Sequence, residues 1–372
     1  MRVAIITESF LPQVNGVTNS VLRLCEQLTR RGHDALVVAP GSGPTSWAGV
    51  PVVRVSSVPV PGYREHRLGL PSPALSGVLE SFAPDVVHLA SPTVLGAQGA
   101  WTAQRLDVPC LAVYQTDLAG FMTQYRAQLA SRAVWRWIRR LHALADLTLA
   151  PSTAAISDLE RHGIPRVRLW PRGVDLDLFH PSRRDPFMRR RIAPGGELIV
   201  GYVGRLAAEK RVDLLGHLAD LAGVRLAIIG DGPQRSELER RLPHARFLGL
   251  LGGEELAGTV ASLDVFVHSG PHETFCQSAQ EALASGVPVV APSSGGLLDL
   301  VRPQENGLLY PPGDGPALRA AVAAVISTPG LRDRLAANAR ASVAERSWTR
   351  IGDAYLDYCA EVLRADSTRL IS

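Results

Sequence analysis

Two glutamates eight residues apart, Glu273 and Glu281, mark the segment of the chain with the clearest chemical pattern. A helical pattern that stops at Gly286 carries Glu281, whereas Glu273 stands in the loop before that helix. The first backbone N–H groups of a helix have no partner inside it and can bind hydroxyls or phosphate oxygens. We expect Glu281, about one to two turns into the helix, to reach a ribose diol and Glu273 to lie near a sugar ring.

A second candidate group contains Lys210, the only lysine among 39 basic residues, and Arg205, five positions before it. Both follow the apolar run 199–203, a predicted strand, so they lie at the carboxyl end of that strand. A forked guanidinium and a compact ammonium together would neutralise a pyrophosphate without a metal. The alternative is a solvated loop in which these cations pair with Glu209.

Gly16 ends a third candidate segment, the loop that starts at Ser9 and joins a predicted strand to a helix. A helix that opens near Thr18 would offer free N–H groups to a phosphate, and a glycine would allow close approach. An ordinary Asn-Gly turn explains the pattern equally well. Neither this loop nor the segment 230–235 has the GxGxxG spacing, so the hypothesis that the protein is a nicotinamide-dependent dehydrogenase loses its main support.

Two patterns resemble metal sites but lack the context that such sites need. The DxD sequence at 175–177 lies in the expected linker, away from the end of a predicted strand. His268 and His272 have the spacing of zinc ligands on a helix, but Gly270-Pro271 between them prevents a helix. The four cysteines lie more than eighty residues apart and form no ligand cluster. We therefore expect no metal and no cofactor, and we expect reduced cysteines in a cytoplasmic protein.

The elements that position these residues form two series of short apolar strands that alternate with helical patterns, which indicates parallel, doubly wound sheets. The expected strands are 3–6, 35–39, 52–55, 86–89, 111–114 and 147–150 in the first series, and 199–203, 225–229, 246–248, 265–268, 288–291 and 307–310 in the second. The pattern breaks at 171–191, which we interpret as a linker without a helix core. The prediction is an α/β protein with domains 1–172 and 173–347 and a C-terminal helix, 348–372, that packs back on the first domain.

Composition and charge exclude several classes of protein. With 372 residues, of which 46% are hydrophobic and 20% charged, the chain has the balance of a two-domain globular enzyme. Its net charge of +4 is too small for a nucleic-acid partner. The N-terminus reaches Glu8 too early for a signal peptide, and no apolar run long enough to span a membrane follows. The segment 131–144 mixes arginines with tryptophans and would suit anionic lipid headgroups, although aromatic residues at helical spacing are more often core.

These segments together resemble glycosyltransferase family 4, whose members are retaining enzymes of GT-B architecture. The resemblance rests on the loop ending at Gly16, on Gly204-Arg205-x4-Lys210 and on the Glu273-x7-Glu281 segment that continues to 290, and it spans nearly the whole chain. Segments 8–16, 88–92 and 268–277 are similar to actinobacterial GDP-mannose-dependent α-mannosyltransferases that glycosylate lipids. The resemblance implies two facing Rossmann-like domains with the ligand in a cleft between them.

The resemblance also assigns roles to individual residues. It places the diphosphate on Arg205 and Lys210, the ribose on Glu281 and the donor sugar beside the catalytic Glu273. The further donor contacts that it implies are Gly16, Leu251, Thr274, Phe275, Cys276 and Gln277. Where many relatives carry His-Thr-Asp, this chain reads Gln115-Thr116-Asp117. Gln115 cannot titrate, so Asp117 is the second catalytic candidate, as a contact for the acceptor or a sugar hydroxyl.

The sequence thus predicts a metal-independent, retaining transferase that moves mannose from GDP-mannose to a lipid-linked acceptor. We expect a cytoplasmic location, with peripheral contact at the inner face of the plasma membrane. Front-face attack is the expectation that the family gives, because no nucleophile is evident. Two alternatives stay open, namely a UDP-sugar donor and a non-transferring protein of the same fold, either a sugar-nucleotide epimerase or a sensor.

Overall fold

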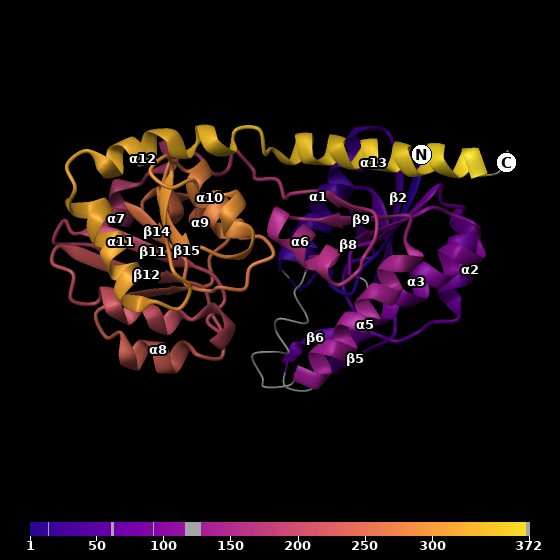
Figure 1. Cartoon of the computed structure of the whole chain (residues 1–372), viewed down its shortest axis with the longest axis horizontal. Coiled ribbons are helices and arrows are strands. Elements are labelled where there is room, and N and C mark those ends of the chain that lie inside the picture. Colours follow the sequence, from indigo (N-terminus) through magenta and orange to yellow (C-terminus); the bar gives the residue numbers. More distant parts are fainter. Residues whose placement is uncertain (14, 61–62, 92, 116–127, 370–372) are drawn as a thin grey trace. The chain divides into compact units, whose positions relative to one another are not determined.

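The computed structural model describes residues 1–13, 15–60, 63–91, 93–115 and 128–369 (Figure 1). The chain divides into two compact units. Unit 1 comprises Met1–Arg172 and Trp348–Ser372, and unit 2 comprises Gly173–Ser347.

Unit 1 is built on an eight-stranded sheet in which parallel pairs dominate. Its strand order is β10-β9-β8-β7-β1-β2-β4-β3, and only the short outer strand β3 pairs antiparallel within it. The strands are β1 (Arg2–Ile6), β2 (Asp34–Pro40), β3 (Ser46–Trp47), β4 (Val50–Val55), β7 (Val86–Leu89), β8 (Cys110–Val113), β9 (Leu147–Ala150) and β10 (Val167–Leu169). The order reverses at β1, so the β1–β7 boundary is the place where an open α/β sheet binds ligands.

An antiparallel hairpin, β5 (Ser57–Val60) and β6 (Tyr63–Gly69), lies outside that sheet. The buried carboxylate of Glu8 holds it in place, because it accepts the N–H of Gly69 at 2.8 Å and that of Leu95 at 2.5 Å. We did not predict this hairpin from the sequence. A carboxylate that follows β1 therefore connects three elements far apart in the chain.

The helices of unit 1 include the C-terminal helix of the chain. They are α1 (Gly16–Arg30), α2 (Ala74–Phe82), α3 (Val94–Arg105), α5 (Gln128–Leu144), α6 (Thr153–Arg161) and α13 (Trp348–Arg369). Helix α13, yellow in Figure 1, runs along α1 and places Tyr355 and Cys359, both fully buried, in the same core as β1. The Trp170 indole donates a hydrogen bond to the Ile351 carbonyl at 3.0 Å, and Arg31 pairs with Asp353 at 2.5 Å.

Unit 2 contains a six-stranded, fully parallel sheet in the order β13-β12-β11-β14-β15-β16. The strands are β11 (Leu198–Val203), β12 (Val224–Ile229), β13 (Arg246–Gly249), β14 (Val265–Val267), β15 (Val289–Pro292) and β16 (Gly307–Tyr310). Their near-continuous apolar runs fit strands that are covered on both faces. The order reverses between β11 and β14, which puts the ligand-binding edge of this sheet at that boundary.

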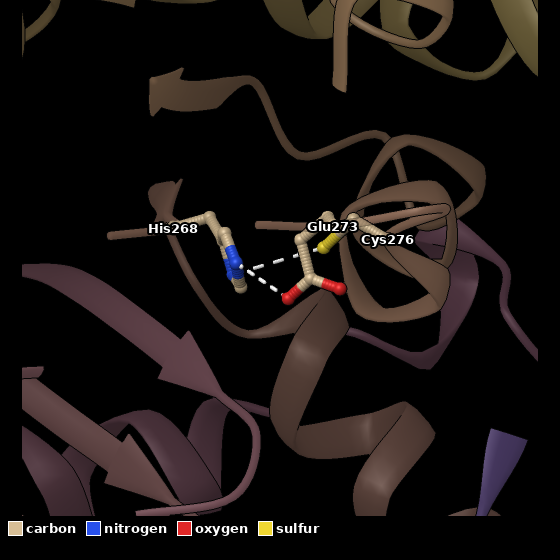
Figure 2. Close-up of side chains that lie close together, drawn as sticks. All are labelled: His268, Glu273 and Cys276. Carbon is tan, nitrogen blue, oxygen red and sulfur yellow. Dashed lines mark hydrogen bonds and ion pairs between the residues drawn. The ribbon is translucent and has the colours of Figure 1, made fainter. Parts of the chain in front are cut away.

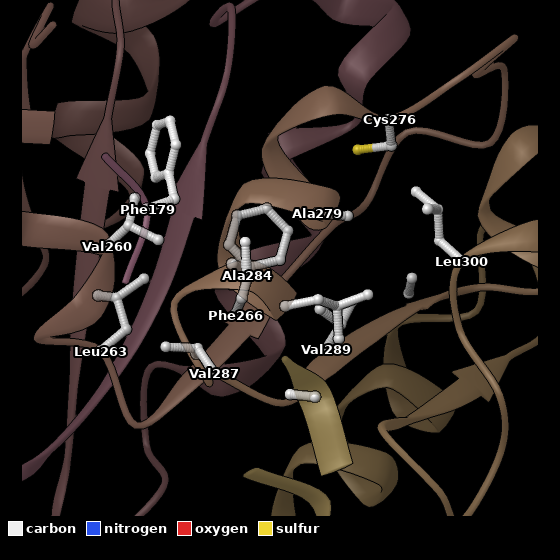
Figure 3. Packing of buried hydrophobic residues seen from close by; sticks show 14 of the residues in the cluster. Phe179, Val260, Leu263, Phe266, Cys276, Ala279, Ala284, Val287, Val289 and Leu300 are labelled. Carbon is white, nitrogen blue, oxygen red and sulfur yellow. The ribbon is translucent and has the colours of Figure 1, made fainter. Parts of the chain in front are cut away.

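Helices cover both faces of the second sheet. The α-helices are α7 (Pro186–Ile192), α8 (Arg235–Arg241), α9 (Gly253–Ala261), α10 (Gln277–Ala284), α11 (Gly315–Ser327) and α12 (Leu331–Ala339), and the 3₁₀ turns are 181–183, 208–210, 212–218, 295–299 and 341–343. Figure 3 shows one of the two cores, where Val260 and Leu263 pack beside Phe266 and Val289. Two parallel-sheet α/β domains confirm the predicted fold class.

The interpretation of 171–191 as a linker without a helix core is wrong for its second half. Residues 186–192 form α7, whose buried Ile192 joins the core of unit 2. Arg184 and Arg189 hold the buried carboxylate of Asp264 at 2.6 and 2.9 Å. Two arginines of this charged stretch are therefore partners of a buried group. In the described part of the chain, every helix is too short or too polar to cross a membrane.

Candidate active site

The candidate site of unit 2 lies at the point where its strand order reverses. The loop after β11 carries Arg205 and Lys210, and the loop after β14 carries Glu273. These two strands are neighbours in the sheet and run parallel, so their carboxyl ends bring both loops together. The predicted phosphate-binding cations and the predicted catalytic carboxylate therefore share one edge of the sheet.

Glu273 is held between two cationic side chains. The Lys210 ammonium lies 2.5 Å from Glu273 Oε1. His268 Nε2 lies 2.9 Å from the same oxygen (Figure 2). Burial alone would raise the pKa of Glu273, but Lys210 and His268 outweigh it and lower that pKa to about 2. Burial would lower the pKa of Lys210, and the Glu273 carboxylate raises it instead. Glu273 is an anion at neutral pH and can only accept hydrogen bonds.

His268 lies directly after β14 and is only 2% exposed. Its Nδ1 faces Cys276 Sγ at 3.7 Å, so the imidazole lies between a sulfur and a carboxylate (Figure 2). Its contact with Glu273 is an ion pair in distance and is not aligned as a hydrogen bond. Burial would lower the pKa of His268, yet Cys276 and Glu273 raise it to about 9. At neutral pH the ring therefore carries a proton on each nitrogen.

Helix α10 begins at Gln277 with Cys276 as its N-cap, and the Cys276 side chain makes no capping hydrogen bond. The first N–H groups of α10 thus receive no side-chain cap from that residue and can serve a ligand. Phe275 is buried in the core, so its backbone and not its ring can contribute to a site. Glu281 lies in the second turn, and burial raises its pKa to about 8. A protonated Glu281 can donate to an oxygen as well as accept from a hydroxyl.

Close backbone packing fixes the loop that carries Arg205. A Cβ at Gly230 would lie 2.0 Å from the Gly204 carbonyl oxygen, and one at Gly232 would lie 2.4 Å from the Leu206 carbonyl oxygen. Both glycines have positive φ, at 131° and 158°. The glycines of 230–235, which lack the GxGxxG spacing, thus support the cationic loop. Arg205 Nη1 lies 3.9 Å from Glu209, the partner that the alternative interpretation named.

A second glycine pair supports the loop of Glu273. The Gly296 N–H donates to the Glu273 carbonyl at 2.7 Å. A Cβ at Gly295 would lie 2.3 Å from that same oxygen, and one at Gly296 would lie 2.5 Å from the Thr274 carbonyl. We did not predict a role for this glycine pair from the sequence.

The remaining predicted contacts of unit 2 differ in how exposed they are. Leu251 packs partly buried against the core, whereas its neighbour Leu250 is 83% exposed. The Gln277 amide donates to the Gly173 carbonyl at 3.1 Å, so that side chain is already engaged.

In unit 1, Gly16 is the first residue of α1, two residues earlier than predicted. The Asn15 side chain accepts the N–H groups of Val17 and Thr18, so those two groups are not free for a phosphate. The Gly16 carbonyl accepts from Arg172 Nη1 at 2.6 Å, and a Cβ at Gly16 would lie 2.5 Å from that nitrogen. Here glycine gives space to an arginine that the sequence analysis did not select.

Gln115 is buried and engaged through both ends of its amide. Its Oε1 accepts from Arg172 Nη2 at 2.8 Å, and its Nε2 donates to the Ala90 carbonyl at 3.1 Å. The side chain that replaces the histidine of many relatives is thus fixed by its own unit. Asp117, the second predicted catalytic residue, lies outside the described residues.

Within the described residues, one group of three has donor atoms close enough to hold a metal. These residues are His268, Glu273 and Cys276, with donor atoms within 4.8 Å of one another. The Lys210 ammonium already contacts the same Glu273 oxygen, so a dication there would face a neighbouring positive charge. In the DxD segment, Asp175 accepts the N–H of Leu178, which gives it a structural role. A metal-independent reaction stays a prediction.

Comparisons with known proteins identify the family. Residues 14–178 match the profile described as "Glycosyltransferase Family 4", and residues 184–342 match "Glycosyl transferases group 1". A Mycobacterium tuberculosis protein named GDP-mannose-dependent alpha-mannosyltransferase is 51% identical over 365 residues, which is 96% of each chain. The chain belongs to glycosyltransferase family 4.

Further similar proteins extend the comparison. A Corynebacterium glutamicum protein with the same name is 45% identical and covers 98% of this chain and 89% of its own. The Arabidopsis thaliana "Sulfoquinovosyl transferase SQD2" is 36% identical over 84% of this chain and 64% of its own. Among solved structures, Anabaena Alr3699/HepE in complex with UDP has a TM-score of 0.80 at 19% identity, covering 97% of this chain and all of that one. At that identity the likeness concerns the fold alone, and it agrees with the predicted GT-B architecture.

Sequence reasoning missed two residues that contact predicted site residues, His268 in unit 2 and Arg172 in unit 1. His268 was set aside with His272 as a false zinc pattern, although its place at the end of a predicted strand could have suggested a ligand-facing role. Arg172 gave no signal, because nothing in the sequence shows that it meets Gly16 and Gln115.

Proposed function

We propose that this protein transfers mannose from GDP-mannose to a lipid-linked acceptor with retention at the anomeric carbon. The observation that carries the proposal is the charged Glu273–Lys210 pair at the strand-order reversal, next to the first turn of α10. The choice of donor is supported by relatives that match nearly the full length of the chain at about half identity.

The proposed chemistry follows from the charges of this site. Lys210 and Arg205 bind the diphosphate and stabilise the negative charge that develops when the bond from the sugar carbon to the phosphate oxygen breaks. GDP leaves with the electron pair of that bond. The acceptor hydroxyl attacks the anomeric carbon from the same face, and its proton passes to a diphosphate oxygen. Glu273, anionic and fixed, accepts hydroxyl hydrogens of the sugar and so orients the ring.

The first test separates donor binding from transfer. We expect GDP to raise the melting temperature in EDTA more than UDP or ADP does, because a ligand that binds only the folded state stabilises it. We expect Glu273→Gln to lower mannosyl transfer about 100-fold or more, since the amide removes the negative charge and replaces one acceptor oxygen by a donor NH₂ group. GDP binding by this variant should not weaken, because Lys210 is then free of its carboxylate.

Glu254→Gln is the matched control, because this side chain is 82% exposed and its ion pair with Arg183 is long. Full activity of the Glu273 variant would contradict the proposed role of this carboxylate. If UDP raises the melting temperature and GDP does not, the proposed site stands, and the donor is a UDP-sugar instead of GDP-mannose.

Unit 1 has a surface that fits the proposed lipid acceptor. Trp101 of α3 and Trp137 of α5 are 52% and 39% exposed, and their rings meet edge to face at 6.4 Å. Arg136 and Arg140 are exposed beside Trp137 on α5. We call these four residues the Trp–Arg face. Indole rings that insert at the headgroup level and guanidinium groups on phosphates together favour an anionic membrane surface.

Vesicle flotation tests this membrane contact. We expect binding to vesicles that contain phosphatidylglycerol, weaker binding to pure phosphatidylcholine, and loss of binding at high salt. Trp101→Ala with Trp137→Ala should lower the bound fraction, whereas Phe187→Ala, which removes a 66% exposed aromatic of unit 2, should not. Equal binding of both variants would exclude the Trp–Arg face as the contact.

A further inference from the structure

Lys210 has to serve two anions once a donor is present. Its ammonium pairs with Glu273 at 2.5 Å, and the proposed function brings a diphosphate to the same ammonium. Glu273 is mostly buried, with 12% of its side chain exposed. A buried carboxylate that loses its cation is costly, so donor binding requires another partner for Glu273.

His268 is the second cation on that carboxylate. Its Nε2 contacts Oε1 of Glu273 at 2.9 Å, the oxygen that also receives Lys210. The ring is locked in place, because it stacks on Tyr202 at 6.0 Å and faces Cys276 through Nδ1. A Cβ at Gly270 would lie 3.2 Å from Nε2, so the chain also closes over the ring.

We propose that His268 is a positioning residue that keeps Glu273 charged and fixed while Lys210 turns to the diphosphate of the donor. This inference rests on the proposed function, since it needs a nucleoside diphosphate at Lys210. It predicts that His268 affects diphosphate binding only through Glu273, without touching the nucleotide. His268 and Glu273 must therefore be energetically coupled.

The test is a double-mutant cycle on GDP affinity, measured by titration calorimetry in EDTA. His268→Phe keeps a ring of similar shape and removes both nitrogens, so we expect GDP affinity to fall about tenfold. His268→Gln retains one N–H group toward Glu273 and should restore part of that loss. The rate of transfer should fall further than GDP affinity, because the sugar contact of Glu273 is also misplaced.

The decisive arm places His268→Phe in the Glu273→Gln background. A neutral amide needs no cation, so we expect His268→Phe to leave GDP affinity unchanged there. A tenfold loss in both backgrounds would show that the ring only fills space and would overturn the proposal, as would unchanged GDP affinity in the single variant. Melting temperatures of all four proteins identify a folding defect, and if His268→Phe does not fold, the same cycle is run with His268→Gln in both backgrounds.

The wild-type titration separates this inference from the proposed function. If GDP fails to bind and UDP binds instead, the cycle is run with UDP and the role of His268 is judged in the same way. If neither nucleotide binds to the wild type, the proposed function fails and the positioning role of His268 fails with it.

Discussion

At the scale of single residues, each unit contains a charged group that is shared between two partners. One carboxylate oxygen of Glu273 receives both Lys210 and His268, and one guanidinium, that of Arg172, serves Gly16 and Gln115. In each case removing one side chain leaves a buried group without its partner. Truncating substitutions of these side chains will therefore lower the free energy of unfolding by more than the loss of the contact alone would.

Arg172→Lys tests the shared guanidinium. The forked guanidinium lets Arg172 donate to two acceptors, at 2.6 and 2.8 Å. Lysine has a single ammonium and cannot reproduce this geometry. We expect the free energy of unfolding of unit 1 to fall by about 1–3 kcal/mol, as for a buried acceptor left unsatisfied. Urea denaturation measures it, with the exposed Arg136→Lys as control. An equal midpoint for both variants would refute the role of the fork.

At the scale of elements, loops are held by backbone contacts that leave no room for a side chain. Gly296→Ala would place a methyl group 2.5 Å from the Thr274 carbonyl and 2.9 Å from Phe275 Cα, so the loop of Glu273 must move. We expect transfer to fall about tenfold to 100-fold, because small displacements of reacting groups are costly. GDP affinity should change less, because Lys210 lies on a different loop.

Gly216→Ala is the control, since its Cβ would meet only a Leu242 methyl at an ordinary 3.7 Å. Assays of GDP-dependent product formation at equal protein concentration provide the comparison. If both variants transfer equally well, the glycine contact does not set the position of Glu273.

The sequence was sufficient to predict the sheets because buried parallel strands need apolar runs, and twelve such runs became strands. It was also sufficient to place Lys210 and Glu273 at strand ends. It could not reveal that His268 meets Glu273, because that contact depends on the path of the loop between them. Helix α7 was missed because three of its seven residues are arginines, and the sequence does not show that one of them, Arg189, pairs with the buried Asp264.

At the scale of the whole molecule, the two units can be followed separately. All six tryptophans belong to unit 1, at positions 47, 101, 135, 137, 170 and 348. Their fluorescence therefore reports on unit 1, while GDP titrations report on the nucleotide site that we propose for unit 2. Stability and ligand binding can thus be assigned to a unit without dividing the chain.

The acid sensitivity of unit 1 follows from His88, which is 1% exposed beside Trp170 and Tyr355. Burial lowers its pKa from 6.5 to about 3. Below pH 6.5, His88 binds a proton in the unfolded state but not in the folded state, so the free energy of unfolding falls as pH falls. We expect His88→Phe to reduce the loss of unfolding free energy between pH 7 and pH 5 by about 2 kcal/mol.

Urea denaturation followed by tryptophan fluorescence at pH 7, 6 and 5 measures this effect. A residual slope should remain in the variant, because burial also lowers the pKa of His142, to about 4. His244→Gln, on an exposed side chain of unit 2, should leave the slope unchanged. Parallel pH profiles for the wild type and His88→Phe would contradict the prediction.

Helix α13 gives the chain a particular order of assembly on the ribosome. The core of unit 1 needs Tyr355 and Cys359, which are synthesised after the whole of unit 2. A nascent chain therefore carries unit 1 with an open apolar groove along α1 until its last helix has left the exit tunnel. Unit 2 can complete its core earlier, so the unit whose synthesis begins first is the last to be finished, and a chain that stops before residue 348 presents that groove to chaperones and proteases.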